Sequence, residues 1–118
     1  MEASRARRVL SGAVDFSVLE RTTGGDDSVS EEVLALFAEQ AAIWSPMLQA
    51  GTDGWRDATH TLRGAAAGIG AGDLARACAE AEAGDGAGLD RVRNELDRAL
   101  ADVAAWRHEL LLRSLKGA

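Results

Sequence analysis

Two histidines, His60 and His108, and one cysteine, Cys78, are the side chains of this 118-residue sequence best suited to nucleophilic chemistry. A neutral imidazole nitrogen is a good nucleophile, and an ordinary pKa of about 6.5 leaves most exposed histidines neutral in the cytoplasm. A helical metal pair or a nucleophile–base pair would need a second ligand or a nucleophile three or four residues after His60. Arg63 and Gly64 occupy those positions, so the local sequence supports neither kind of site. We interpret His108 as a surface residue and Cys78 as a packed, unreactive thiol.

His60 is predicted to lie on the exposed face of a helix over residues 55–69. At about 100° per residue, the apolar side chains of this segment gather on one side. The residues on the opposite side are Arg56, His60, Arg63, Gly64 and Ala67. His60 therefore points to solvent and is not a packed core histidine.

Small residues follow His60 on this face, at Gly64, Ala67 and Gly68. A glycine inside a helix costs about 1 kcal/mol relative to alanine. The missing side chains give a second protein room to approach the imidazole, which is the interpretation favoured for Gly64. Close packing between helices is the alternative, particularly for Gly68.

Two arginines flank the imidazole, because Arg56 lies one turn before His60 and Arg63 one turn after it. Guanidinium groups there would place positive charge where an anion must bind. Either arginine could instead be an ordinary solvated surface residue, and this is the favoured interpretation for Arg56. We assign Arg63 to binding of that anion, and Arg56 with Gly64, Ala67 and Gly68 to access and partner docking.

The composition predicts helices and excludes several functions. The sequence is 47% hydrophobic, contains one proline and no tyrosine, and has a net charge of −6. That acidic balance argues against a nucleic-acid binder, which needs a basic face. The arginines at positions 5, 7 and 8 indicate a solvated tail, with a short binding arm as the alternative. With one cysteine, no apolar run of about 18 residues and no signal-type segment, we expect a cytoplasmic protein without membrane contact.

One domain over residues 14–118 is predicted to follow a flexible tail, residues 1–13. The pattern indicates a short helix and four longer ones, at residues 15–21, 28–49, 55–69, 73–83 and from 89 onward. Expected helix caps are Asp15, Ser28 with Glu31, Thr52 or Asp53, and Asp73. Pro46 should bend the second helix or loosen its last turn.

Short connections make the long helices antiparallel neighbours. The fold class is therefore all-α, an up-down-up-down antiparallel four-helix bundle with a short N-terminal extra helix as a lid. The last helix has the clearest apolar seam, and the helix over 28–49 a weaker one. These seam positions are Leu89, Val92, Leu96, Ala99, Val103, Trp106 and Leu110, and Val33, Phe37, Gln40, Trp44 and Met47.

The segment over residues 60–82 resembles the histidine-containing phosphotransfer (HPt) family of bacterial two-component phosphorelays. That family's signature is His-x-Leu-Lys-Gly-small-small, followed by Gly, Leu, Cys and Glu at set intervals. The matching residues are His60, Leu62, Gly64, Ala65, Ala66, Gly70, Leu74, Cys78 and Glu82. Arg63 stands where lysine is commoner, which keeps the charge but replaces a compact ammonium by a planar fork. The resemblance makes Arg63 the phosphate-stabilising residue.

The resemblance implies that His60 accepts a phosphoryl group from a receiver-domain aspartate, or from a histidine kinase, and passes it to another receiver. The partners would be response-regulator receiver domains and a hybrid histidine kinase. Mg²⁺ and the acidic cluster would belong to the receiver, so the chain itself is expected to need no cofactor or metal. It would be a phosphocarrier and not an enzyme with its own nucleotide site.

Two other functions stay open at this point. One is a helical adaptor that is never phosphorylated, which the exposed imidazole argues against. The other is a kinase-type dimerisation domain, in which an acidic residue usually follows the phosphorylated histidine; here Thr61 does. We expect a monomer, although the seam of the last helix leaves dimerisation open.

Overall fold

The computed structural model describes residues 10–117, and these residues form five α-helices and one short 3₁₀ helix. The helices are α2 (Phe16–Thr23), α3 (Asp27–Trp44), α4 (Trp55–Ile69), α5 (Gly72–Ala83) and α6 (Leu89–Gly117), and η1 (Ser45–Met47) follows α3. The predicted all-α class is confirmed. The arginines at positions 5, 7 and 8 lie outside the described residues.

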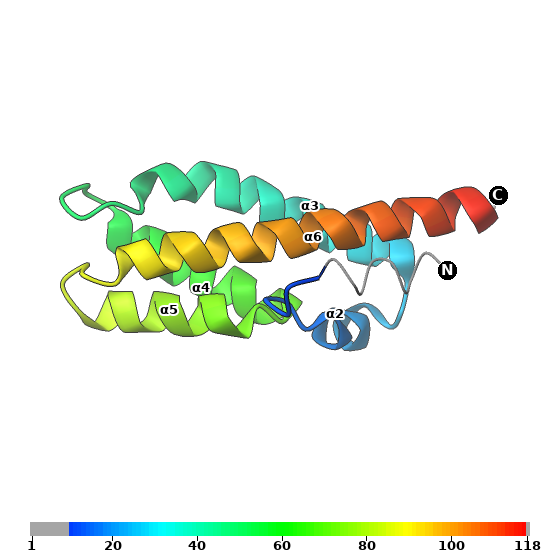
Figure 1. Ribbon diagram of the computed structural model, residues 1–118, viewed down its shortest axis with the longest axis horizontal. Coiled ribbons are helices and arrows are strands. Elements are labelled where there is room, and N and C mark those ends of the chain that lie inside the picture. The colour runs from blue at the N-terminus through cyan, green and yellow to red at the C-terminus, as the bar shows by residue number, and fades with distance from the viewer. Residues whose placement is uncertain (1–9, 118) are drawn as a thin grey trace.

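Helices α3, α4, α5 and α6 form the predicted bundle, in which each helix packs against the next and α6 returns to α3 (Figure 1). The molecule is elongated, 49 × 23 × 22 Å, because α6 is much longer than α4 and α5. The first half of α6 lies beside α5, and the last turns of α6 extend beyond the ends of α4 and α5 (Figure 1). Helix α2 packs against α3 and α4, as expected for the short extra helix.

Every position of the predicted seam of α6 is buried, including Trp106, whose ring stacks on Phe16 of α2 at 5.0 Å between ring centres. The predicted seam of α3 is only partly the observed one. Phe37 is buried, but Leu34 and Ala41 are the other apolar side chains of α3 in the core, while Val33 and Trp44 lie at its edge. Two overlapping apolar stripes fit the sequence of this helix, and packing against α4 and α6 selects one of them.

The helix ends differ from the predictions at the caps. Asp15 caps α2 as predicted, accepting a hydrogen bond from the Ser17 amide, but Asp26 caps α3 in place of Ser28. The N-cap residues of α4 and α5 are Gly54 and Ala71, and neither helix has a side-chain cap. Thr52, Asp53 and Asp73 therefore do not have the expected role. Helix α3 ends at Trp44 because Pro46, at the start of η1, has no amide hydrogen to continue the α-helical ladder.

Part of the segment expected to be a tail is attached to the bundle. The buried carboxylate of Asp102 in α6 accepts hydrogen bonds from the Ser11 amide at 2.8 Å, the Ser11 hydroxyl at 3.0 Å and the Val14 amide at 3.3 Å. Asp15 then donates its amide to the carbonyl of Gly70 at 2.9 Å. These bonds fix residues 11–15 between α6 and the end of α4.

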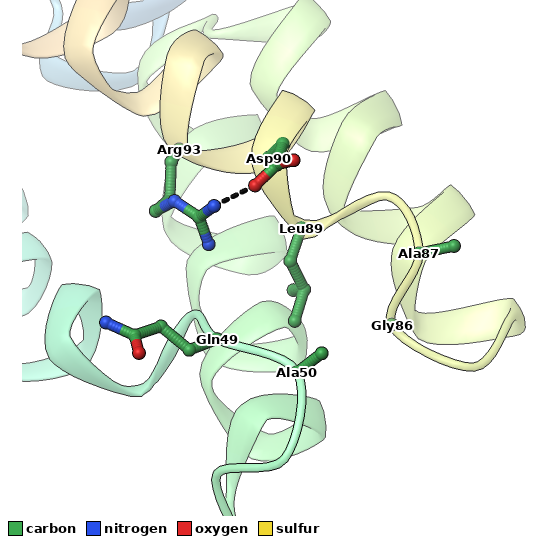
Figure 2. A pocket seen from close by; sticks show the side chains of 7 residues that line it. All are labelled: Gln49, Ala50, Gly86, Ala87, Leu89, Asp90 and Arg93. Carbon is green, nitrogen blue, oxygen red and sulfur yellow. Dashed lines mark hydrogen bonds and ion pairs between the residues drawn. The ribbon is translucent and has the colours of Figure 1, made fainter.

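The connections α3–α4 and α5–α6 meet at one end of the bundle, where they and the start of α6 line an open hollow of about 470 Å³ (Figure 2). Arg93 of α6 lies at its edge, donates to the carbonyl of Leu48 and pairs with Asp90. This arginine therefore ties α6 to the connection that leads into α4. Within residues 10–117, no helix combines the length and apolar character needed to cross a membrane.

Candidate functional site

His60 lies near the middle of α4 on the exposed face, as the helical periodicity predicted. Its side chain is 65% exposed. Ala58, Leu62 and Ala66 are fully buried on the opposite face. Burial of that face fixes the rotation of α4 about its axis and so directs the imidazole outward.

Glu82 of α5 binds the imidazole, with 2.9 Å between His60 Nδ1 and Oε1. A carboxylate only accepts hydrogen bonds, so Nδ1 carries the proton in this contact. In the neutral ring, Nε2 then keeps its lone pair and is the nucleophilic nitrogen. The contact thus selects one tautomer of an exposed imidazole.

Arg63 completes a three-residue cluster beside the ring. Its NH1 lies 3.2 Å from Glu82 Oε2, and its NH2 lies 3.5 Å from His60 Nδ1. A guanidinium can only donate, so it competes with Glu82 for Nδ1, and the shorter contact to Glu82 prevails. Glu82 Oε2 is shielded from solvent and has no aligned hydrogen bond, so the charge of Arg63 compensates it.

The small residues beside His60 leave open space. Gly64, Ala67 and Gly68 are exposed, and a Cβ atom built on either glycine would meet no atom within 4 Å outside its own helix. Close helix packing, the alternative interpretation for Gly68, is therefore absent from the described residues. Among the described residues, no neighbouring atom requires glycine at either position.

Arg56 is exposed, but its guanidinium is occupied. NH1 donates to the main-chain carbonyl of Glu82 at 2.6 Å, and NH2 donates to that of Gly84 at 2.7 Å. The guanidinium carbon also lies 4.5 Å from the centre of the Trp55 ring. Arg56 therefore joins α4 to the end of α5 on the same side as His60.

Cys78 lies one turn before Glu82 on α5 and is fully buried. Burial raises the pKa of its thiol from 9.0 to about 11, and the negative charge of Glu82 adds to the effect while Arg63 opposes it. The thiol stays protonated at neutral pH and is a poor nucleophile. This confirms the prediction of a packed cysteine.

The cluster joins His60 and Arg63, which the sequence had singled out, to Glu82, which it had listed only as a position of the motif. His60 and Glu82 are 22 residues apart on different helices. Helical spacing cannot relate such residues; only the motif interval pointed to Glu82. His108 is exposed on α6, and no described hydrogen bond or ion pair joins it to His60 or Glu82.

Comparison with known proteins gives two matches. The model of the Hpt domain family matches residues 30–106, which is more than half of the chain. The crystal structure of the histidine phosphotransferase ShpA from Caulobacter crescentus is similar, with 55% sequence identity and a TM-score of 0.82, over 88% of this chain and 99% of ShpA. Among curated proteins, no match was found.

These matches agree with the site. The matched segment contains His60, Arg63 and Glu82, and the bundle that holds them is the fold of a solved histidine phosphotransferase. The chain belongs to the Hpt family and is a phosphorelay protein of that family.

Proposed function

We propose that His60 is the phosphoacceptor, taking the phosphoryl group of a receiver-domain aspartate, or of a histidine kinase, and passing it to another receiver. The observation that carries this proposal is the 2.9 Å contact between Nδ1 and Glu82 on a ring that is 65% exposed. The contact holds a nucleophilic nitrogen ready on a surface that a partner can reach. Proteins of this family work with receiver domains and histidine kinases.

In the forward step, the lone pair of Nε2 forms a bond to phosphorus while the bond from phosphorus to the aspartyl oxygen breaks. The aspartate leaves as a carboxylate, and the imidazole keeps its proton on Nδ1. The phosphorylated ring is therefore cationic, and the Glu82 carboxylate compensates that charge. The step reverses when a second aspartate carboxylate attacks the phosphorus.

Arg63 has a different task in this proposal. Its guanidinium lies beside the ring, within 3.5 Å of Nδ1, and its side chain is 42% exposed. Phosphoryl transfer depends mainly on positioning and on compensation of charge on the phosphoryl oxygens. A planar donor at this place can bind those oxygens as they arrive.

The same proposal makes the chain a carrier in the cytoplasm, where it would meet phosphorylated receivers. Mg²⁺ for the transfer would be bound by the receiver. An adaptor that is never phosphorylated would gain nothing from an imidazole held in one tautomer. Because a carrier of this kind has no nucleotide site of its own, ATP alone should leave the protein unlabelled.

The test is transfer from a ³²P-labelled receiver domain, with the acid lability of the label as evidence for phosphohistidine. We expect the wild-type chain to gain label and His60→Gln to gain none. His108→Gln is the matched control, since His108 is the other of the two histidines, and it should behave as wild type. Label on His60→Gln, or none on wild type with any receiver of the source organism, would contradict the proposal.

A further inference from the structure

Arg56 connects α4 to the last turn of α5 in a way that its exposed position does not suggest. Its two terminal nitrogens donate to two different carbonyls, those of Glu82 and Gly84. A planar guanidinium fork fits two fixed acceptors, whereas an ammonium group offers a single point of charge. The Trp55 ring under the guanidinium limits where this fork can move.

Of the two carbonyls that Arg56 binds, that of Glu82 is in the last turn of α5, and that of Gly84 belongs to the residue that caps this helix. The last four carbonyls of an α-helix have no partner within the helix, and α5 ends at Ala83. A cation is favourable at this end because the helix dipole is negative there. Just beyond, the Trp55 ring packs on Gly86, where an added Cβ would lie 3.4 Å from a ring atom. The end of α5 is thus held against the first turn of α4.

Helix α4 therefore binds Glu82 both at its main chain and at its carboxylate, which Arg63 also contacts. The main-chain carbonyl of Glu82 is held by Arg56, and its carboxylate meets His60, four residues further along α4. A partly exposed contact between carboxylate and imidazole contributes little by itself, because water screens it and both side chains lose rotational freedom. Such a contact keeps its geometry only when the atoms that carry it are held by their surroundings.

We propose that Arg56 is a positioning residue for phosphotransfer: by holding the main chain of Glu82, it sets the carboxylate that selects the reactive tautomer of His60. This rests on the proposed function of His60. It also gives Arg56 a role different from partner docking, because both of its terminal nitrogens are engaged within the chain.

The experiment compares Arg56→Ala, Arg56→Lys and wild type. Arg91→Ala serves as the control, because Arg91 pairs with the exposed Glu80 on the same helix as Glu82. Imidazole ¹⁵N chemical shifts report which nitrogen of His60 carries the proton. Transfer from a phosphorylated receiver over a range of receiver concentrations gives the maximal rate and the half-saturating concentration separately.

We expect Arg56→Ala to populate the second tautomer of His60 and to lower the maximal transfer rate about 10-fold, with the half-saturating concentration unchanged. Arg56→Lys keeps charge and length but cannot bridge two carbonyls, so it should not restore the rate. It also keeps the test valid if Arg56→Ala fails to fold. Arg91→Ala should match wild type in both measurements.

Two results would overturn the inference. One is wild-type ¹⁵N shifts and a wild-type maximal rate in both Arg56 variants. The other is a raised half-saturating concentration with unchanged ¹⁵N shifts, which would make Arg56 a docking residue. Either result is distinct from failure of the proposed function, which would appear as label on His60→Gln.

Discussion

At the scale of single residues, the two nitrogens of one imidazole have different surroundings. Nδ1 faces a carboxylate at 2.9 Å, and Nε2 is left for a partner on a ring that is 65% exposed. Exposure and orientation usually oppose each other, because a side chain in water samples several rotamers. Here α5, through Glu82, orients the imidazole of His60 without burying it.

Removing the charge of Glu82 should slow transfer. Glu82→Gln can still accept a hydrogen bond from Nδ1, but it cannot compensate the cationic phosphorylated ring. A hydrogen bond to a charged group contributes about 1.5–3 kcal/mol, so we expect the rate to fall about 10-fold or more. Single-turnover transfer from a phosphorylated receiver measures it. Glu80→Gln, at an exposed position two residues earlier, is the control, and equal rates in the two variants would contradict the role of Glu82.

Gly64 should show opposite effects on stability and on transfer. Gly64→Ala should raise the free energy of unfolding by about 0.5–1 kcal/mol, because alanine favours the helix and its methyl group meets open space. Gly64→Leu should block transfer by filling the approach to His60. Urea denaturation and transfer assays test the two effects. Ala101→Leu adds a side chain to the exposed face of α6 and should leave transfer unchanged; unaltered transfer by Gly64→Leu would refute the steric argument.

At the scale of elements, the end of α4 determines where α2 docks. Gly70 ends α4 with φ of +88°, and a Cβ there would lie 2.2 Å from the carbonyl oxygen of Asp15. The same residue accepts the Asp15 amide through its own carbonyl. Glycine is thus required both by the backbone conformation and by the close approach of the segment that leads into α2.

Gly70→Ala should therefore destabilise the protein, in contrast to Gly64→Ala six residues earlier. The left-handed conformation alone costs a residue with a side chain about 1–2 kcal/mol, and the contact with Asp15 adds to it. We expect a loss of more than 2 kcal/mol, measured as a lower urea midpoint. Gly68→Ala, in open space on the same helix, is the comparison. Similar stabilities for Gly70→Ala and Gly68→Ala would show that α2 does not depend on this contact.

The sequence predicted the elements better than their ends or their mutual register. The range predicted for α4, residues 55–69, is the observed one, since glycines bound a clear periodic segment. The spacing of Ser28 and Glu31 predicted a cap at Ser28, but Asp26 caps α3; both are good capping residues, and local spacing does not rank them. Glu82 had no predicted role, because its distance from His60 depends on how far α5 slides along α4. Packing and the Arg56 contacts set that distance, and no single-helix pattern contains them.

At the scale of the whole molecule, stability at alkaline pH should depend on one buried thiol. The sequence contains no tyrosine, and its one lysine, Lys116, lies near the C-terminal end. The pKa of the Cys78 thiol is about 11 in the folded chain, against an ordinary value of 9.0. The unfolded chain therefore loses this proton first as the pH rises. The stabilisation is fully present below pH 9 and is lost as the pH approaches 11.

We expect the urea midpoint to fall between pH 9 and pH 11, by an amount corresponding to about 2 kcal/mol. Cys78→Ala should flatten this dependence, although a smaller side chain in the core lowers its stability at every pH. A midpoint that falls equally in wild type and Cys78→Ala would show that another group is responsible. Alkylation of Cys78 should likewise require unfolding.

The hydrogen bond between Ser11 and Asp102 has consequences for the order of folding and for the design of truncated fragments. It joins residues 91 positions apart, so it closes a long loop and is favourable only after most of the bundle has formed. The segment shared with the family, residues 30–106, includes Asp102 but lacks Ser11 and Val14, which supply its hydrogen-bond donors. A fragment trimmed to that segment would leave the carboxylate without these donors and Trp106 without Phe16. We therefore expect a stable fragment of this chain to need Ser11 and Val14 as well as the matched segment.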